Sequence, residues 1–204
     1  MFEPILNGNE IIGAYNLKLV FLSYFIAAFA SYTALDLAMR IGESHGKPKK
    51  FWIGGCAFAM GGGIWAMHFT GMLAFELPIA ISYDVTITIF SLLFAIFASG
   101  CAFFYVSQKT NTYSRVLLGG IFMGSGVGTM HYSGMQAMNF SGSMYYEPIY
   151  FVTSIFIAIL ASTVALRLII YFENNAQKEN YKYKVLASLI MGLAVSGMHY
   201  TGMN

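Results

Sequence analysis

Six apolar stretches constrain this chain more than any other feature, because each is close to the length that crosses a lipid bilayer. Mean hydropathy is +0.63, 57% of the residues are hydrophobic and only 10% are charged, which is unusual for a soluble domain. A helix needs about 20 apolar residues to cross the hydrocarbon core. We predict membrane spans at residues 19–39, 51–75, 85–106, 116–137, 149–172 and 185–203.

The distribution of charge predicts how these spans are oriented. The connections after the first, third and fifth spans hold most of the basic residues, which are Arg40, Lys47, Lys49, Lys50, Lys109, Arg115, Lys178, Lys182 and Lys184. The opposite face carries Glu3, Glu10, Glu76, Asp84 and Glu147, with Lys18 as its single basic residue. Because cytoplasmic loops are enriched in Lys and Arg, we expect the N-terminus outside. The basic residues thereby serve orientation, and we do not expect nucleic-acid binding.

The chain contains three repeats, approximately residues 15–75, 83–137 and 146–203, each with two spans. The aligned positions are Tyr15, Tyr83 and Tyr146; Ser23, Ser91 and Ser154; Met60, Met123 and Met191; and Gly61, Gly124 and Gly192. Because each repeat crosses the bilayer twice, all three enter from the same side and are related by an axis along the membrane normal. The predicted fold is an all-α membrane protein of six transmembrane helices, built as three parallel helical hairpins.

One six-residue motif ends every repeat and contains three of the four histidines. The copies are MHFTGM at 67–72, MHYSGM at 130–135 and MHYTGM at 198–203. His68, His131 and His199 lie 18, 16 and 15 residues beyond the preceding cytoplasmic charge, a rise of roughly 22 to 27 Å. An ionisable group in a membrane helix is costly and usually faces the bundle interior. We therefore expect the three imidazoles to meet at one depth near the outer surface.

Metal binding is the chemistry that the motif predicts. Each histidine is followed by a methionine four residues later, so an imidazole and a thioether share one helix face. Soft sulfur with imidazole favours copper, above all Cu(I), whereas zinc sites rarely use thioether. The candidate ligands are His68, His131, His199, Met67, Met130, Met198, Met72, Met135 and Met203. One shared site and three separate sites both fit the pattern.

The alternative without metal is purely structural. The histidines would then hydrogen-bond neighbouring helices, and the methionines would fill the core. Other motif positions have supporting roles in either case. The hydroxyls of Thr70, Ser133 and Thr201 can bond to carbonyls one turn earlier. Phe69 stands where the other copies have Tyr132 and Tyr200, so a phenol cannot serve all three units equally.

Residues outside the motif receive simpler interpretations. His45 belongs to a basic connection and is expected to be solvated. Cys56 and Cys101 match neither each other nor the motif, and we interpret them as packing residues. Asp36 and Arg40 lie one helical turn apart and are expected to pair.

These motifs resemble those of the MHYT domain, a bacterial membrane sensor module, over nearly all of the chain. The resemblance implies copper binding through the motif residues, for which the matching positions are Met67, His68, Met130, His131, Met198 and His199, with Tyr132 and Tyr200 as weaker candidates. It also implies sensing of oxygen, carbon monoxide or nitric oxide, and attachment to cytoplasmic enzymes that make or degrade cyclic di-GMP. We expect residues 1–204 to form one such domain, without an output domain and the seventh helix it would require.

The predicted function is therefore a metal-dependent sensor module in the bacterial cytoplasmic (inner) membrane, and not an enzyme. Its partners would be the lipid bilayer, a gas ligand and a cytoplasmic signalling domain, and oligomers are compatible with this role. The alternatives are a small metal or proton transporter, a haem protein in which two histidines ligate the iron, and a structural interaction module. Zinc and haem are second to copper as the expected cofactor.

Overall fold

The computed structural model describes residues 13–107, 112–140, 142, 144–175 and 181–203, together with the backbone of 5–6 and 9–10. Three charges used to predict orientation, Glu3, Lys109 and Lys178, lie outside the described residues, as does the side chain of Glu10.

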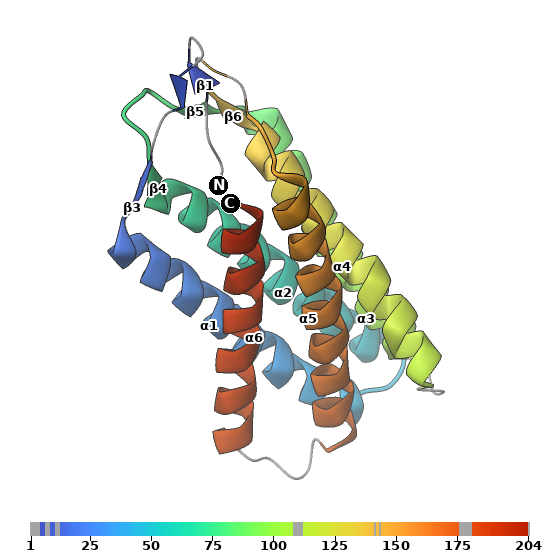
Figure 1. Ribbon diagram of the computed structural model, residues 1–204. Helices are drawn as coiled ribbons and strands as arrows, with labels where there is room; N and C mark the ends of the chain where they lie inside the picture. Colours follow the sequence, from blue (N-terminus) through green and yellow to red (C-terminus); the bar gives the residue numbers. More distant parts are fainter. Residues whose placement is uncertain are drawn as a thin grey trace.

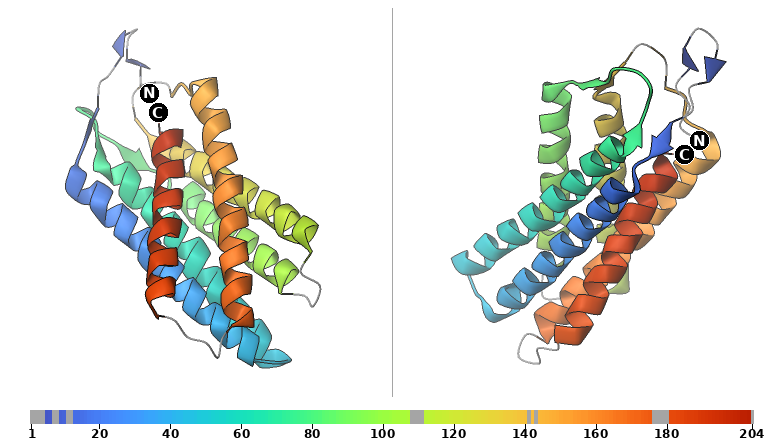
Figure 2. Two further views of the ribbon diagram at one scale, coloured as in Figure 1. Left: turned by 60° about the horizontal axis from the view of Figure 1, so that its bottom comes forward. Right: turned by 90° about the vertical axis from the view of Figure 1, so that its left-hand side faces the viewer.

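Six long helices make up most of the described chain (Figure 1). They are α1 (Leu17–Glu43), α2 (Lys47–Ala74), α3 (Val85–Val106), α4 (Tyr113–Gln136), α5 (Pro148–Asn174) and α6 (Tyr181–Gly202). Each agrees with a predicted span to within about one helical turn. Consecutive helices pack against one another, and α6 also packs against α1, so the helices close into a ring. Figures 1 and 2 show α1 and α6 side by side.

The helix starts follow from local sequence. The side chains of Asn16 and Asp84 accept hydrogen bonds from the backbone N–H groups of Lys18 and Ile87, which otherwise have no partner in the first turn. Pro148 begins α5, where its missing N–H costs nothing because that position has no helical acceptor.

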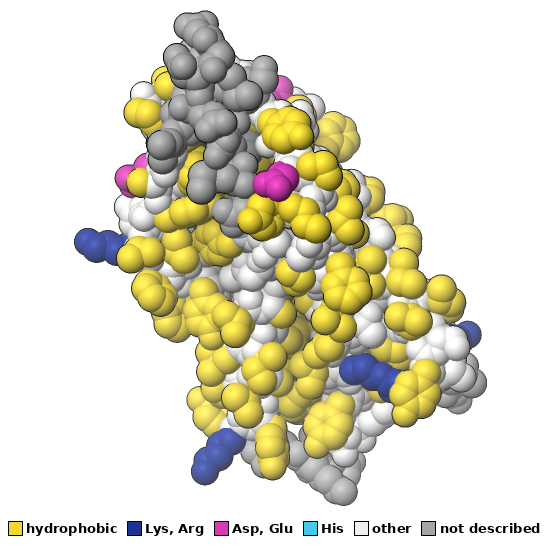
Figure 3. All heavy atoms as spheres, in the orientation of Figure 1, with side chains coloured by type: hydrophobic (Ala, Val, Ile, Leu, Met, Phe, Trp, Pro, Cys, Tyr) yellow, Lys and Arg dark blue, Asp and Glu magenta, His cyan; other side chains and the backbone are white. Residues whose placement is uncertain are grey.

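Four helices, α1, α3, α5 and α6, are long and apolar enough to cross a membrane. The prediction of a multi-pass membrane protein is confirmed at that level. Helices α2 and α4 are similarly long, with 28 and 24 residues, but their many glycines make them less apolar, so their crossing stays a prediction. Figure 3 shows apolar side chains over the middle of the visible face, acidic ones near the strand-bearing end and basic ones mostly at the opposite end.

Short antiparallel strands link helix ends at one end of the molecule. Strand β3 (Ala14–Tyr15) pairs with β4 (Phe75–Glu76), and β5 (Ser82–Tyr83) pairs with β6 (Met138–Asn139). A further pair joins β1 (Ile5–Leu6) to β2 (Asn9–Glu10). Because β3 precedes α1 and β4 follows α2, this pairing makes the two helices antiparallel. The same holds for α3 and α4, which follow β5 and precede β6.

Aligned glycines join each helix pair to the next. A Cβ atom on Gly61 would lie 2.6 Å from the backbone of α3, one on Gly124 would lie 2.5 Å from the backbone of α5, and one on Gly192 would lie 2.8 Å from the backbone of α1. No side chain fits at such distances, so glycine lets the two backbones touch. The contacts run in one direction around the ring, from each repeat to the following one.

The basic end differs from the prediction at Lys184. The sequence groups this residue with the loop charges, whereas in the first turn of α6 its side chain is only 1% exposed and its Nζ is 2.7 Å from Asp36 Oδ1. The expected pair of Arg40 with Asp36 is confirmed at 3.7 Å, although it is longer than the Lys184 contact. Burial of a lysine stem beside a carboxylate satisfies its charge away from water. Lys184 therefore joins α6 to α1 at the basic end instead of projecting into solvent.

Replacement of Gly61 with alanine is expected to destabilise the protein by about 1–3 kcal/mol, because the new methyl group collides with backbone rather than with a movable side chain. Thermal unfolding in detergent, followed by circular dichroism, measures the change. Gly62→Ala is the matched control, since nothing lies within 4 Å of its Cβ position. Equal melting temperatures for the two variants would contradict the backbone contact.

Candidate metal centre

The three motif histidines meet at a single point inside the helix ring. The Nδ1 atom of His68 lies 3.1 Å from that of His199 and 3.1 Å from that of His131, and the last two are 3.3 Å apart. All three side chains are at most 1% exposed. They come from α2, α4 and α6, one from each repeat, at the position that follows the first methionine of the motif. Among the described residues they form the one group of three or more potential His, Cys, Asp or Glu ligands.

Three touching imidazole nitrogens cannot satisfy one another by hydrogen bonds alone. A neutral ring nitrogen carries either a proton or a lone pair. Among three such atoms at least two are alike, so at least one of the three contacts joins two donors or two acceptors. In a buried site an unsatisfied contact of this kind is costly. A cation at the centre removes the conflict, because all three lone pairs can then point toward it.

The outer edge of each ring lies against a glycine of the next motif. A Cβ atom on Gly134 would collide with Nε2 of His68, one on Gly202 with Nε2 of His131, and one on Gly71 with Nε2 of His199. The glycine at the fifth position of the motif is thus explained by a ring from another repeat. Any larger residue at this position would displace the ring from its place beside the centre.

The motif methionines surround this centre in two sets, and all six are at most 2% exposed. Those at the end of the motif, Met72, Met135 and Met203, pack together with Phe75 and Met138 near the strands. Met130 and Met198 belong to the main helical core. The structure therefore brings the three predicted histidine ligands together, while the methionines flank them within apolar clusters.

A second ring of contacts fixes the motif aromatics. The hydroxyl of Tyr132 lies 2.6 Å from Ser154 Oγ, and the hydroxyl of Tyr200 lies 2.9 Å from Ser23 Oγ. In the first repeat, where Phe69 lacks a hydroxyl, the equivalent Ser91 Oγ accepts a hydrogen bond from Trp65 Nε1 at 3.1 Å. The sequence alignment contained these serines, but we assigned them no role. The phenols are engaged with serines of the next repeat.

The other predictions for this region have mixed outcomes. Thr70 and Thr201 donate to carbonyls one turn earlier, at Ala66 and Gly197, and Ser133 donates to Met130. These hydroxyls stabilise their own helices, and none of these bonds reaches a histidine. Cys56 is fully buried and donates to the carbonyl of Ala34 at 3.4 Å, as a packing residue would. His45 lies on the surface in the connection between α1 and α2.

Tyr132→Phe is expected to lower stability by about 0.5–1.5 kcal/mol, because the buried Ser154 hydroxyl loses its 2.6 Å partner. Tyr150→Phe serves as the control, since this residue is 39% exposed at the start of α5. Chemical unfolding of both variants in one detergent measures the difference. If Tyr150→Phe has the larger effect, the Tyr132–Ser154 contact does not tie α4 to α5 as described.

Comparison with known proteins gives consistent matches. The family model for the MHYT bacterial signalling protein N-terminal repeat matches residues 61–119 and 124–178. MucR of Pseudomonas aeruginosa, named as a bifunctional diguanylate cyclase/cyclic di-GMP phosphodiesterase, is 44% identical over 95% of this chain and 28% of its own length. The cyclic di-GMP phosphodiesterase NbdA of the same organism is 41% identical over 93% of the chain and 24% of its own length. No solved structure matches.

A relative from a distant bacterium extends this pattern. The signaling protein YkoW of Bacillus subtilis is 38% identical over 95% of this chain and 24% of its own length. The chain thus spans about a quarter of the length of these relatives. The family match and these relatives support the expectation of a signalling module. On the family match and these identities, the chain belongs to the MHYT family of bacterial signalling proteins.

Proposed function

We propose that this protein is a membrane sensor in which His68, His131 and His199 hold one metal ion, copper, and report a diatomic gas or the redox state. The observation that carries the proposal is the triangle of Nδ1 atoms, 3.1 to 3.3 Å on a side. A point equidistant from three such atoms is about 1.8 Å from each, near the 2.0 Å typical of a metal–imidazole bond. One shared site is therefore favoured over three separate ones.

The surroundings of the triangle favour copper as the ion. All three ligands are neutral imidazoles, with buried thioethers on either side, a set that suits a soft monovalent ion better than a hard divalent one. When bound, copper would supply a Cu(I)/Cu(II) couple and a coordination position for a small ligand. Because Nδ1 of all three rings faces the centre, the three lone pairs would point toward the ion. The ring protons would then reside on the Nε2 atoms, which lie beside the glycine of the next motif and have no hydrogen-bond partner among the described residues.

The contacts between repeats support a route for the signal. Each histidine rests on the motif glycine of the following repeat, so a change in the spacing of the rings moves all three helix pairs against one another. At the basic end, Lys49 of α2 pairs with Glu173 of α5 at 2.9 Å and donates to the carbonyl of Ser107 after α3. Movement at the histidines can therefore reach a point where three repeats are tied together.

The relatives suggest what receives the signal. MucR and NbdA carry names of enzymes of cyclic di-GMP metabolism and extend well beyond the matched segment. We propose that the present module regulates a cytoplasmic output of this kind. Its location would be the bacterial inner membrane, with all six helices crossing as three parallel hairpins, the N-terminus outside and the histidines near the outer face. The charge pattern and the antiparallel strand-linked helices support this arrangement.

Two other interpretations fit the geometry less well. A haem between two of these histidines would need a macrocycle where the three Nδ1 atoms already touch. A structural triad without a cation would retain at least one contact between like nitrogens. A single small ion bound between the three Nδ1 atoms therefore fits the geometry better than haem or a metal-free triad.

Metal analysis of the His68→Ala/His131→Ala/His199→Ala variant tests the site. After reconstitution with Cu(I), elemental mass spectrometry is expected to find one copper ion fewer per chain than in wild type, because the three ligands are lost. His45→Ala is the matched control and should bind like wild type, since its ring is on the surface. Metal-free wild type, or equal copper in the triple variant, would rule out the site. In loaded wild type alone, carbon monoxide or oxidation should change spin-label distances between α2 and α5.

Labelling of single cysteines tests the orientation. In a background without Cys56 and Cys101, a membrane-impermeant maleimide is expected to label Ala80→Cys in intact cells, because this exposed residue lies between β4 and β5. His45→Cys, in the connection between α1 and α2, should react only after the cells are opened. The reverse pattern would place the histidines near the cytoplasmic face. Labelling of both sites in intact cells would mean that α2 does not cross.

A further inference from the structure

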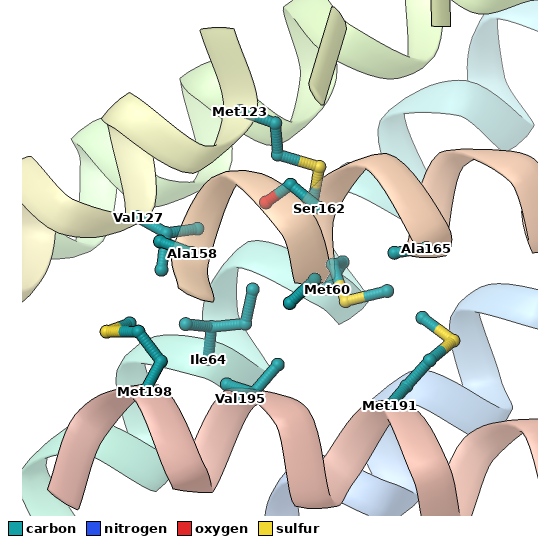
Figure 4. Close-up of a pocket in the computed structure, with 11 residues that line it drawn as sticks. Met60, Ile64, Met123, Val127, Ala158, Ser162, Ala165, Met191, Val195 and Met198 are labelled. Atoms are coloured by element: carbon teal, nitrogen blue, oxygen red, sulfur yellow. The ribbon is translucent and has the colours of Figure 1, made fainter. Parts of the chain in front are cut away.

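A small cavity lies in the helical core beside Met198. It has a volume of about 20 Å³ for a water-sized sphere, and its walls come from α2, α4, α5 and α6. Figure 4 shows that four methionines, Met60, Met123, Met191 and Met198, are among the residues that line it. A volume of this size can admit one water or one small ion.

Three of these methionines occupy one position in the threefold repeat. Met60, Met123 and Met191 each lie eight residues before a motif histidine, on α2, α4 and α6. Their exposed fractions are 1%, 2% and 4%. Eight residues correspond to about 12 Å along a helix, so this methionine layer lies that far from the histidine layer, toward the basic end. Figure 4 shows the three side chains entering from three different helices.

Packing alone does not account for this layer. Methionine is commonly used because its flexible side chain fills irregular gaps. Here four methionines and seven other residues line a gap that remains open. Leucine or isoleucine at the three equivalent positions would supply similar apolar volume with better-defined rotamers. What methionine adds at these positions is a thioether sulfur, repeated three times around one cavity.

We propose that Met60, Met123 and Met191 form a second metal site, specific for a soft monovalent cation of the Cu(I) or Ag(I) type. Thioethers select such ions over harder ones. None of the residues lining the cavity is an Asp, Glu, His or Cys, and Ser162 contributes the single side-chain oxygen. This donor set excludes magnesium, calcium and zinc as ligands of choice. The site is independent of what the histidines bind.

Silver titration of the purified chain in lipid nanodiscs tests the proposal. Ag(I) is the probe because it does not undergo oxidation, and Cys56 and Cys101 are replaced by alanine to remove competing thiols. The parent protein is expected to bind two Ag(I) ions per chain, whereas Met60→Leu/Met123→Leu/Met191→Leu should bind one. The triple His→Ala variant should also retain one, and its X-ray absorption spectrum should show only sulfur neighbours.

Leucine preserves the apolar volume at the three positions, so the variant is expected to fold. Met39→Leu is the matched control, since Met39 is buried in the same core but does not line the cavity. Equal Ag(I) binding by the parent and the triple Met→Leu protein would overturn the second site. So would a folded triple His→Ala protein that binds none. If the histidine site does not exist, the triple His→Ala variant would bind as many Ag(I) ions as the parent. The two failures therefore give different results.

Discussion

The contact among three imidazole nitrogens is the constraint on which the rest of the structure depends. At least one of the three contacts, which are 3.1 to 3.3 Å long, joins two like nitrogens that repel each other in a buried site, so the surrounding structure must hold the rings together. A glycine of the next motif leaves room for each ring at a place where any side chain would collide with Nε2. Farther out, glycines allow the helices to touch, and serines anchor two motif tyrosines. The outer layers thus serve to fix the positions of three atoms.

Departures from threefold symmetry show which features are constrained. Phe69 removes a phenol from the first repeat, yet Trp65 reaches the same serine from one turn earlier, so the contact survives the substitution. At the basic end, Lys184 stands where the other repeats have buried Ile53 and Val116. Lys184 joins α6 to α1 through Asp36, whereas the apolar residues at the same position of the first two repeats form no ion pair. The histidine end is therefore nearly symmetric, whereas the basic end distinguishes the third repeat from the other two.

Sequence predicted the helices and the convergence of the histidines, because long apolar runs and aligned motifs depend on local pattern and symmetry. It could not show that Nδ1 rather than Nε2 faces the centre, since the surroundings of each ring include a glycine of another repeat. It also failed for Lys184, whose stem is buried by tertiary packing against Asp36 and Tyr32. The sequence alignment showed Ser23 and Ser154 at equivalent positions. It could not show that they hydrogen-bond Tyr200 and Tyr132, because each tyrosine belongs to another repeat.

The direction of the ring-to-glycine contacts limits how such a protein can change in size. The ring of His68 lies against Gly134, that of His131 against Gly202 and that of His199 against Gly71. Each repeat thus contributes one ring and one glycine, and the three contacts form a closed cycle. In an open solenoid, units can be added or removed at an end because each contacts only its neighbours. Here the loss of one repeat would leave one histidine ring without the glycine that it packs against, and one glycine without a ring beside it. The number of repeats is therefore fixed at three by the closed cycle of contacts.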